Sequence, residues 1–420
     1  MNTLRHSLLL AGLTLVSTYT QAQRKCGAAI LYAKRAQYNP ALVLQRKQAE
    51  QRTQAWIAQR TQNKQTGGVV IIPVVVHVIY NTTVENISAA QIQSQIDVLN
   101  ADYRKLNIDT LPSTHPFASV TADTKVQFCL ASTDPNGNAT DGITRTYTAT
   151  TSFTGNGDEK YTSNGGHDNW DATQYLNMWV CNADASGLLG YATFPTDLAI
   201  NPTEDGVVIN VYSFGTIGTA GTNGYSTFAD GRTATHEVGH WLNLFHIWGD
   251  NTCGDDLVTD TEIAQAANFG CPAFPHNANG SCGQGANGEM YMNYMDYVDD
   301  ACMNMFTKGQ TARIDAALNN ERLAILTSTA CSGTTALKNN STKNNLQLYP
   351  NPATDKLYIT LVDNSTTDIN VQITDVSGRI VLQQSTIVTN AINVNNLVAG
   401  TYFVKITNGT TVVVKTFNKN

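Results

Sequence analysis

The apolar residues in the first part of the chain follow two periods. Between residues 87 and 103 they recur at spacings of three and four, which predicts a helix that begins after a capping Ser88. Elsewhere, short runs rich in β-branched and aromatic residues predict strands. These runs cover residues 69–80, 125–130, 176–181, 188–194 and 206–212. Strands mixed with long helices favour an α/β or α+β body at residues 69–331.

The pattern changes after Cys331. Residues 332–345 are rich in Ser, Thr, Asn and Lys and have no apolar period, which is typical of a linker. From residue 346 to residue 420, short stretches alternate between apolar and polar residues, with turn residues between them. The predicted strands are residues 357–361, 369–373, 380–384, 401–407 and 411–417. This end of the chain therefore predicts a small all-β sandwich.

The N-terminus has the features of an export signal. Arg5 and His6 precede an apolar run at residues 8–16, and small residues surround a cleavage site after Ala22. We therefore interpret residues 1–22 as a signal peptide; the alternative is a short buried helix. No apolar run reaches the roughly 18 residues that a transmembrane helix needs. Export would permit disulfide bonds among the eight cysteines.

Charge is unevenly spread along the 420 residues. Residues 23–68 hold nine Lys and Arg against one acid, Glu50, a net charge of +8. Residues 1–22 add one positive charge, so the net charge of −7 leaves −16 for residues 69–420. The acidic total argues against a general nucleic-acid binder. Opposite charges also predict that the basic segment 23–68 is attracted to the body that follows it.

The chemistry is concentrated in one motif. His236, Glu237 and His240 form the pattern His-Glu-x-x-His. Two histidines four residues apart share one face of a helix and can bind one metal ion. Glu237 would lie beside the open position of that metal, where it can take a proton from a water molecule that the metal activates.

A third histidine extends this motif. His246 lies six residues after His240 and reaches the same ion only if the helix ends between them. Asn243 suits such an end, because Asn tolerates the left-handed conformation after a helix. Three neutral imidazoles and a water molecule are typical of catalytic zinc. The alternative is a helix with surface histidines that bind no metal.

The segment from His236 to His246 resembles the elongated zinc motif of metzincin metalloproteases, which usually have Gly where this chain has Asn243. Within that group, about residues 70–331 resemble the pappalysin family, which includes cytophagalysin and ulilysin. The matching segments are residues 72–77, 188–195, 232–236 and 290–307. The resemblance implies an α+β fold, a metzincin-like zinc protease domain with a mixed twisted sheet and long helices.

The resemblance also implies roles for three residues near 300. Met295 would be the methionine that packs beneath the metal. Tyr297 would donate a hydrogen bond to the oxyanion that forms during hydrolysis. Asp300 would lie at the base of the S1′ pocket and favour Arg or Lys after the scissile bond. The plainer alternatives are a core methionine, an ordinary tyrosine and a solvated loop carboxylate.

Substrate would bind along residues 188–194, which resemble the edge strand of the metzincin cleft. An extended peptide adds to such an edge and presents its carbonyl to the zinc. Leu188, Gly190 and Tyr191 are the candidate binding residues, and Gly190 would allow close backbone approach. The alternative is an ordinary strand of the sheet.

A loop after the histidines resembles the calcium loop of the family. Clustered carboxylate and carbonyl oxygens suit calcium, a hard cation. The candidate ligands are Asp255, Asp256, Thr259 and Thr261. Here Glu262 replaces the proline that the family usually has, and the alternative is an acidic turn without metal.

The cysteines leave several pairings open. Cys253, Cys271, Cys282 and Cys302 lie within fifty residues, which suits local cross-linking, and four cysteines allow three pairings. The family resemblance implies Cys253–Cys282 and Cys271–Cys302. The predicted strands contain Cys129 and Cys181, which form either a third pair or two buried thiols.

Residues 24–27, Arg-Lys-Cys-Gly, resemble the cysteine switch of metzincin propeptides. The thiolate of Cys26 would occupy the fourth position of the zinc and exclude water. This resemblance predicts a latent zymogen with a basic propeptide at residues 23–68, which is released by cleavage near Arg60 or Lys64. The alternative is a disulfide between Cys26 and Cys331.

The last domain, residues 346–420, resembles the C-terminal sorting domain of type IX secretion cargo. The resemblance is carried by residues 348–353, 375–379 and 397–402 and by Lys415. It implies recognition by the type IX machinery and passage through the periplasm to the cell surface or the medium. The alternative is a β-sandwich that binds carbohydrate or protein.

Together these features predict a secreted zinc endopeptidase that acts on proteins or peptides, with Glu237 as general base. The alternative from another class is a secreted binding or adhesion protein with a structural metal. Glu237 argues against that alternative, because a structural site needs no adjacent base and usually fills all four metal positions.

Overall fold

A computed structural model of the chain describes residues 24–62, 68–331, 347–360, 369–375, 380–385, 391–408 and 411–420. The chain forms two compact units, one within residues 1–333 and the other within residues 334–420. The predicted signal peptide, residues 1–22, and the predicted linker, residues 332–345, lie outside the described residues. None of the described helices combines the length and the hydropathy needed to cross a membrane.

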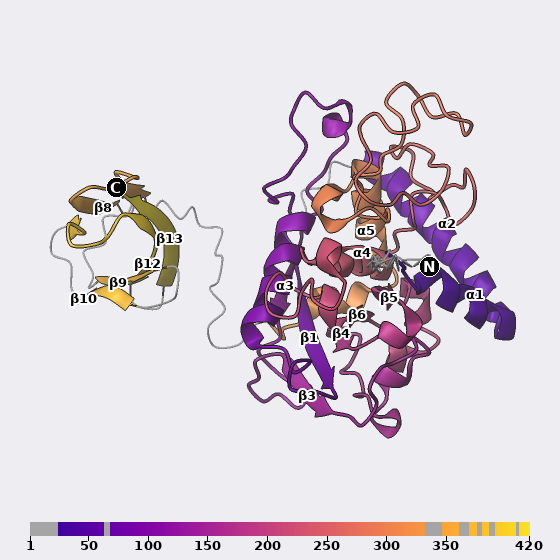
Figure 1. Cartoon of the computed structure of the whole chain (residues 1–420), viewed down its shortest axis with the longest axis horizontal. Helices are drawn as coiled ribbons and strands as arrows, with labels where there is room; N and C mark the ends of the chain where they lie inside the picture. The colour runs from indigo at the N-terminus through magenta and orange to yellow at the C-terminus, as the bar shows by residue number, and fades with distance from the viewer. Residues whose placement is uncertain are drawn as a thin grey trace, which may run out of the picture. The chain divides into compact units, whose positions relative to one another are not determined.

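A six-stranded sheet forms the centre of the first unit (Figure 1). The strands are β1 (Val70–Tyr80), β2 (Val126–Leu130), β3 (Ile143–Tyr147), β4 (Leu176–Cys181), β5 (Gly190–Ala192) and β6 (Val207–Asn210). The order is β2-β1-β4-β6-β5, and β3 also pairs with β1. All neighbours are parallel except β5, which runs antiparallel to β6 at the edge.

Alternate residues of β1 face two different cores. Ile72, Val74, Val76 and Val78 are buried with the apolar residues of two helices, α3 (Ala89–Tyr103) and α4 (Arg232–Trp241). On the opposite face, Ile79 packs with residues from segments 153–191. Because both faces are covered, the strand is an almost unbroken apolar run, as expected of a parallel sheet.

The strand and helix predictions for this unit are largely confirmed. Helix α3 begins after Ser88, whose side chain accepts a hydrogen bond of 3.1 Å from the amide of Gln91. Strand β5 is shorter than the predicted 188–194. Strand β6 ends at Asn210 because the Asn210 side chain caps a following 3₁₀ turn. Strand β3 was not predicted.

Helix α5 (Lys308–Asn319) and two helices of the basic segment complete the unit. These two are α1 (Ala28–Tyr38) and α2 (Pro40–Gln62), and α2 packs against α5. A disulfide joins Cys129 in β2 to Cys331, so both alternatives that paired these cysteines elsewhere are wrong. Cys26 and Cys181 are buried free thiols.

The second unit contains two antiparallel sheets that share one apolar core. One sheet has the order β10-β9-β12-β13, and the other has the order β11-β8-β7. The strands are β7 (Gln347–Tyr349), β8 (Lys356–Thr360), β9 (Ile369–Asp375), β10 (Ile380–Ser385), β11 (Ala391–Asn393), β12 (Gly400–Asn408) and β13 (Thr411–Lys419). This arrangement is the all-β region expected from the sequence; β7 and β11 are additional short strands.

Candidate metal centre and substrate cleft

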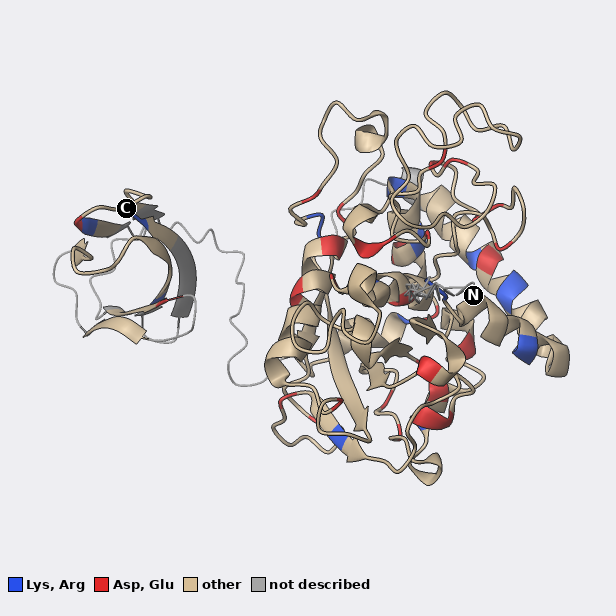
Figure 2. Cartoon of the chain, in the orientation of Figure 1, with Lys and Arg blue, Asp and Glu red and all other residues tan. Residues whose placement is uncertain are grey.

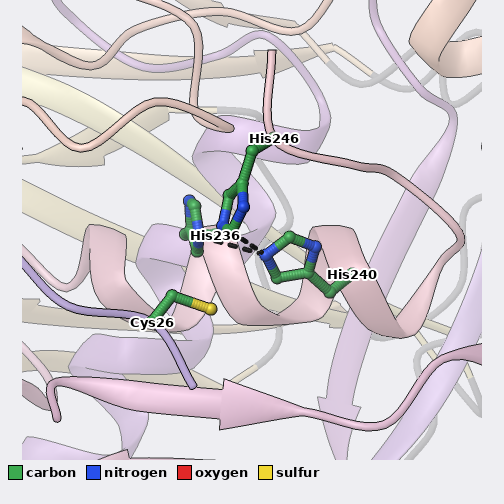
Figure 3. Close-up of side chains that lie close together, drawn as sticks. All are labelled: Cys26, His236, His240 and His246. Carbon is green, nitrogen blue, oxygen red and sulfur yellow. Dashed lines mark hydrogen bonds between the residues drawn. The ribbon is translucent and has the colours of Figure 1, made fainter. Parts of the chain in front are cut away.

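Helix α4 carries the first two histidines of the motif, His236 and His240, one turn apart. The helix ends at Trp241, and Asn243 then adopts a φ of 74°, the left-handed conformation expected from the sequence. This turn brings His246 to the other two histidines. The Nε2 atom of His240 lies 3.2 Å from that of His236 and 3.1 Å from that of His246 (Figure 3).

The outer nitrogen of each imidazole is held by an oxygen atom. Nδ1 of His236 lies 2.7 Å from the carbonyl oxygen of Tyr294, and Nδ1 of His240 lies 2.8 Å from that of Leu244. Nδ1 of His246 contacts the carboxylate of Asp250. Because a carbonyl only accepts, Nδ1 of His236 and of His240 carries the proton, which leaves each Nε2 lone pair free for a metal.

All three rings are buried, and burial disfavours the imidazolium form. Burial, followed by the neighbouring His246, lowers the pKa of His240 to about 3. Burial likewise lowers the pKa of His236 well below its usual value. Neutral imidazoles with free lone pairs fit a metal ion.

The thiol of Cys26 completes this group. The Cys26 sulfur and one nitrogen from each histidine all lie within 4.8 Å of one another, and Figure 3 shows Cys26 directed toward the rings. Among the described residues, this is the only group of three or more His, Cys, Asp and Glu that could hold a metal. The donor set of three imidazoles and one thiol is one that transition metals such as zinc prefer.

Glu237 lies beside the group formed by Cys26 and the three histidines. Its Oε2 is 3.3 Å from the Cys26 sulfur, and its side chain is buried. Burial raises the pKa of Glu237 to about 8, against the opposing effects of Cys26 and Arg24. Gly190 of β5 gives Glu237 its space, because a Cβ atom on Gly190 would lie 2.9 Å from the Glu237 Cγ.

The basic segment pairs with the edge of the sheet. The amide of Gly27 donates to the carbonyl of Gly190 at 3.0 Å, and the amide of Leu189 donates to the carbonyl of Lys25 at 3.0 Å. The Cys26–Gly190 bridge is parallel. Of the other predicted edge residues, Leu188 packs against Gly27, while the Tyr191 hydroxyl turns to the buried Glu159. Residues 24–27 therefore occupy the edge that was predicted to bind substrate.

Asp300 receives an arginine of the same segment. The Arg24 guanidinium forms a fully buried ion pair with Oδ1 of Asp300. The other carboxylate oxygen accepts hydrogen bonds from the amides of Asp230 and Arg232, at 3.0 and 3.1 Å. Arg24 also donates to the carbonyl of Val298 at 3.2 Å. Asp300 is thus fixed by the backbone and presents one oxygen to a cation.

Met295 and Tyr297 both contact the histidine motif. A Cβ atom on Gly239 would lie 2.5 Å from the Met295 sulfur, so Met295 packs directly against helix α4. The Tyr297 ring centroid lies 4.9 Å from that of His246, and its hydroxyl accepts a hydrogen bond of 3.3 Å from the amide of Cys26. Sequence reasoning did not identify Trp248, which stacks on His246 at 4.4 Å.

The predicted calcium loop forms a hydrogen-bonded turn. Asp255 accepts from the amide of Leu257 at 2.7 Å, and Oδ1 of Asp256 accepts from the Thr261 hydroxyl at 2.8 Å. Oδ2 of Asp256 is buried without a hydrogen-bond partner. The two disulfides implied by the family resemblance, Cys253–Cys282 and Cys271–Cys302, are both present.

Comparison with known proteins agrees with this geometry. Residues 159–319 match the profile of the pregnancy-associated plasma protein-A family, and residues 347–420 match that of the secretion system C-terminal sorting domain. An extracellular metalloprotease of Arthroderma otae is 30% identical over 318 residues, which cover 75% of this chain and 97% of that protein. A second one, from Arthroderma benhamiae, is 29% identical over 315 residues, covering 74% and 96%.

Solved structures give the same result. Mature mirolysin of Tannerella forsythia in complex with a cleaved peptide is 45% identical, with a TM-score of 0.59, over 63% of this chain and 98% of that one. A promirolysin variant from the same organism is 42% identical, with a TM-score of 0.62, over 72% and 97%.

The fold and the site thus define a secreted metalloprotease of the metzincin type with a type IX sorting tail. The chain belongs to the family of pregnancy-associated plasma protein-A, the pappalysins. The match to the sorting domain places it among proteins exported by the type IX system. The binding-protein alternatives for the two units are therefore not supported.

Proposed function

We propose that this chain is the latent form of a zinc endopeptidase that cleaves peptide bonds before arginine or lysine. One observation carries the proposal: residues 24–27 place an arginine on Asp300 and a thiol among three histidines. The segment would thus supply a fourth ligand to the metal and would also fill the position of a substrate side chain.

His236, His240 and His246 would hold the zinc, and Cys26 would take the position that the attacking water needs. The chemistry that zinc supplies is Lewis-acid polarisation of the scissile carbonyl and of the water molecule. In the latent form, the Cys26 sulfur lies 3.3 Å from Oε2 of Glu237, so the thiol occupies the space in which Glu237 would contact the attacking water.

After Cys26 leaves, Glu237 takes a proton from the attacking water and passes it to the departing amine. The hydroxyl of Tyr297 accepts a hydrogen bond from the amide of Cys26 in the latent form, and after release it would donate to the oxyanion. A substrate would replace residues 25–27 on the edge of β5, through backbone hydrogen bonds to Leu189 and Gly190.

The pocket of Asp300 supports the predicted preference after the scissile bond. Arg24 fills it with hydrogen bonds to Asp300, the Val298 carbonyl and Thr233, and its guanidinium lies 5.0 Å from the centre of the Phe228 ring. A planar group with several donors satisfies all of these partners at once. Arginine should therefore be preferred over lysine.

Calcium is a second metal proposal. It is supported by the buried, unpartnered Oδ2 of Asp256 in a loop with Asp255, Thr259 and Thr261. A hard cation would satisfy that oxygen, whose burial is otherwise costly. Addition of calcium should raise the thermal midpoint of the wild type but not that of Asp256→Ala; an equal effect on both proteins would contradict the site.

The decisive experiment is peptide cleavage by the full chain after release of its propeptide, using a mixed-sequence library read by mass spectrometry. Cleavage before Arg, abolished by Glu237→Ala and by a zinc chelator, would support the proposal. Asp300→Asn should lose the Arg preference while retaining cleavage. No cleavage by a folded, zinc-loaded protein would contradict the enzyme assignment.

A further inference from the structure

We propose that Asp197 and Glu204 form a second acidic subsite, which binds a basic side chain of the substrate on the opposite side of the metal from Asp300. This inference rests on the proposed proteolytic function. It starts from Arg35 of α1, a residue of the propeptide. The Arg35 guanidinium lies 3.6 Å from Asp197 and forms an ion pair with Glu204.

Both carboxylates are held by the catalytic unit, not by the propeptide. The amide of Phe194 donates to Asp197 at 3.0 Å. The Tyr161 hydroxyl donates to Oε1 of Glu204 at 2.8 Å, which leaves Oε2 for Arg35. In Asp197 the amide of Phe194 and Arg35 contact the same oxygen, Oδ2. Glu204 resembles Asp300, in which one oxygen is fixed by the catalytic unit and the other pairs with Arg24. The two acids therefore keep their positions when the propeptide leaves.

No cation of the catalytic unit takes the place of Arg35 in the described contacts. Lys160 donates through Nζ to the backbone carbonyl of Glu204 at 2.6 Å, and its charge is shared among three buried acids, Glu159, Asp205 and Asp197. Release of α1 therefore leaves two carboxylates without their cation. Figure 2 shows basic residues along α1 and α2 at a side of the unit where acidic residues colour neighbouring segments.

The position of the Asp197–Glu204 subsite relative to the metal follows from the path of the propeptide. Arg24 lies at Asp300, Cys26 lies at the histidines, and α1 continues beyond them. Residue Phe194, three before Asp197, has its ring centroid 5.4 Å from that of His240. If the residue after the scissile bond occupies the Asp300 pocket, the residues before that bond extend toward Asp197 and Glu204.

The distance gives a register. From Cys26 to Arg35 the propeptide is mostly helical and advances about 1.5 Å per residue over nine residues, roughly 14 Å in all. An extended substrate advances about 3.3 Å per residue, so it covers this distance in about four residues. A cavity of about 360 Å³ between α1 and the acids offers the space; on the catalytic side it is lined by Asn156, Asp197, Ile200, Asn201 and Glu204.

The test uses the full chain after propeptide release, with two peptides that share Arg after the scissile bond and carry Arg or Gln three to five residues before it. The wild type should cleave the Arg peptide with a kcat/KM roughly two to five times higher, as expected for a partly exposed ion pair. In Glu204→Gln and in Asp197→Asn with Glu204→Gln, this ratio should fall to about one.

The control is Asp141→Asn, an exposed acid that lies outside the cleft contacts and should keep the wild-type ratio. Because the ratio is internal to each protein, partial loss of fold does not imitate the effect. Equal cleavage of both peptides by the wild type would overturn the subsite but leave the protease assignment intact. No cleavage of either peptide would instead contradict the proposed function.

Discussion

The side-chain amide of Asn243 donates a hydrogen bond of 3.2 Å to the hydroxyl of Thr53 in the propeptide helix α2. Asn243 is the left-handed residue between the second and third histidines, where related metzincins usually have glycine. A glycine would allow the same turn but has no side chain. In this chain, the turn of the metal motif therefore contacts the propeptide directly, independently of Cys26.

We expect Asn243→Gly to weaken latency without removing activity. Glycine adopts a positive φ without strain, so the three histidines keep their arrangement, while the link to Thr53 is lost. The variant zymogen should convert to its mature form faster than the wild type, and mature activity should stay within about a factor of three. A time course on a gel measures the rate of conversion, and a peptide assay measures the mature activity. Thr53→Val should give the same acceleration.

The double variant Asn243→Gly with Thr53→Val tests whether the faster conversion comes from loss of this one hydrogen bond or from a general destabilisation of the zymogen. Because both substitutions remove one contact, their effects on conversion rate should not add. Additive effects, or a mature Asn243→Gly enzyme with little activity, would show that Asn243 serves the turn rather than the propeptide.

A buried ion pair should hold α2 more strongly than an exposed one. Glu50 accepts two hydrogen bonds from Arg313, at 2.8 and 2.9 Å, and the Arg313 side chain is fully buried. Arg52 pairs with Glu321, but half of the Arg52 side chain is exposed. Glu50→Gln should lower the unfolding free energy of the zymogen by about 2 kcal/mol, and Arg52→Gln by about 0.5 kcal/mol.

Both variants are compared by thermal denaturation in a Glu237→Ala background, which prevents self-cleavage. Equal losses would mean that burial of Arg313 does not decide the strength of the contact. Arg313 also donates through Nε to the carbonyl of Asn243 at 3.2 Å, so this pair reaches the metal motif as well.

Stability should depend on pH through Asp102. Burial raises its pKa to about 6, against the charge of Arg232 and hydrogen bonds from Thr235 and Tyr294. Because the folded-state pKa lies above the unfolded value of about 3.9, its contribution is fully present below about pH 4 and is lost as pH rises through 6. Relative to Asp102→Asn, the wild type should therefore lose up to about 3 kcal/mol over this window.

The measurement is urea unfolding of both proteins, in the Glu237→Ala background, between pH 4 and 8. Taking the difference between the two removes the other titrating groups that they share. Asp141→Asn, an exposed substitution, should show no such change. A difference that stays constant across the window would contradict a raised pKa for Asp102.

Replacement of zinc by cobalt should show whether the Cys26 thiol binds the metal. In the cobalt-loaded zymogen with Glu237→Ala, a cysteine ligand gives a sulfur-to-metal charge-transfer band in the near ultraviolet. Cys26→Ser should lose this band and retain cobalt, since His236, His240 and His246 remain. If Cys26→Ser leaves the spectrum unchanged, Cys26 is not a ligand of the metal. As a control, removal of cobalt with a chelator should abolish the cobalt spectrum of either protein.

Most of the sheet and the metal motif could be predicted from the sequence, because both follow short periods. The run 69–80 is almost entirely apolar because both faces of the strand are covered. The histidine spacings follow the helical turn and the end of the helix before Asn243. Strand β3 was missed because its sequence, Ile-Thr-Arg-Thr-Tyr, is only partly buried and has no apolar run.

Contacts between distant residues could not be derived in the same way. Asp250, which holds His246, follows the motif without any periodic signal. The disulfide Cys129–Cys331 joins residues 202 positions apart, and no local spacing favours it over the alternatives. The partner of Asp300 is Arg24, which lies 276 residues earlier in the chain. The basic composition of residues 23–68 predicts a general attraction to the acidic body but not this particular ion pair.

The Cys129–Cys331 disulfide has a mechanical consequence. Cys331 is the last described residue before the segment that leads to the sorting domain, and Cys129 lies in β2, within the parallel sheet. A pull on the tail, as during export or tethering at the cell surface, would reach β2 through this covalent bond. The load would then act on hydrogen bonds between strands, while α5 and the metal motif would be shielded from being peeled away.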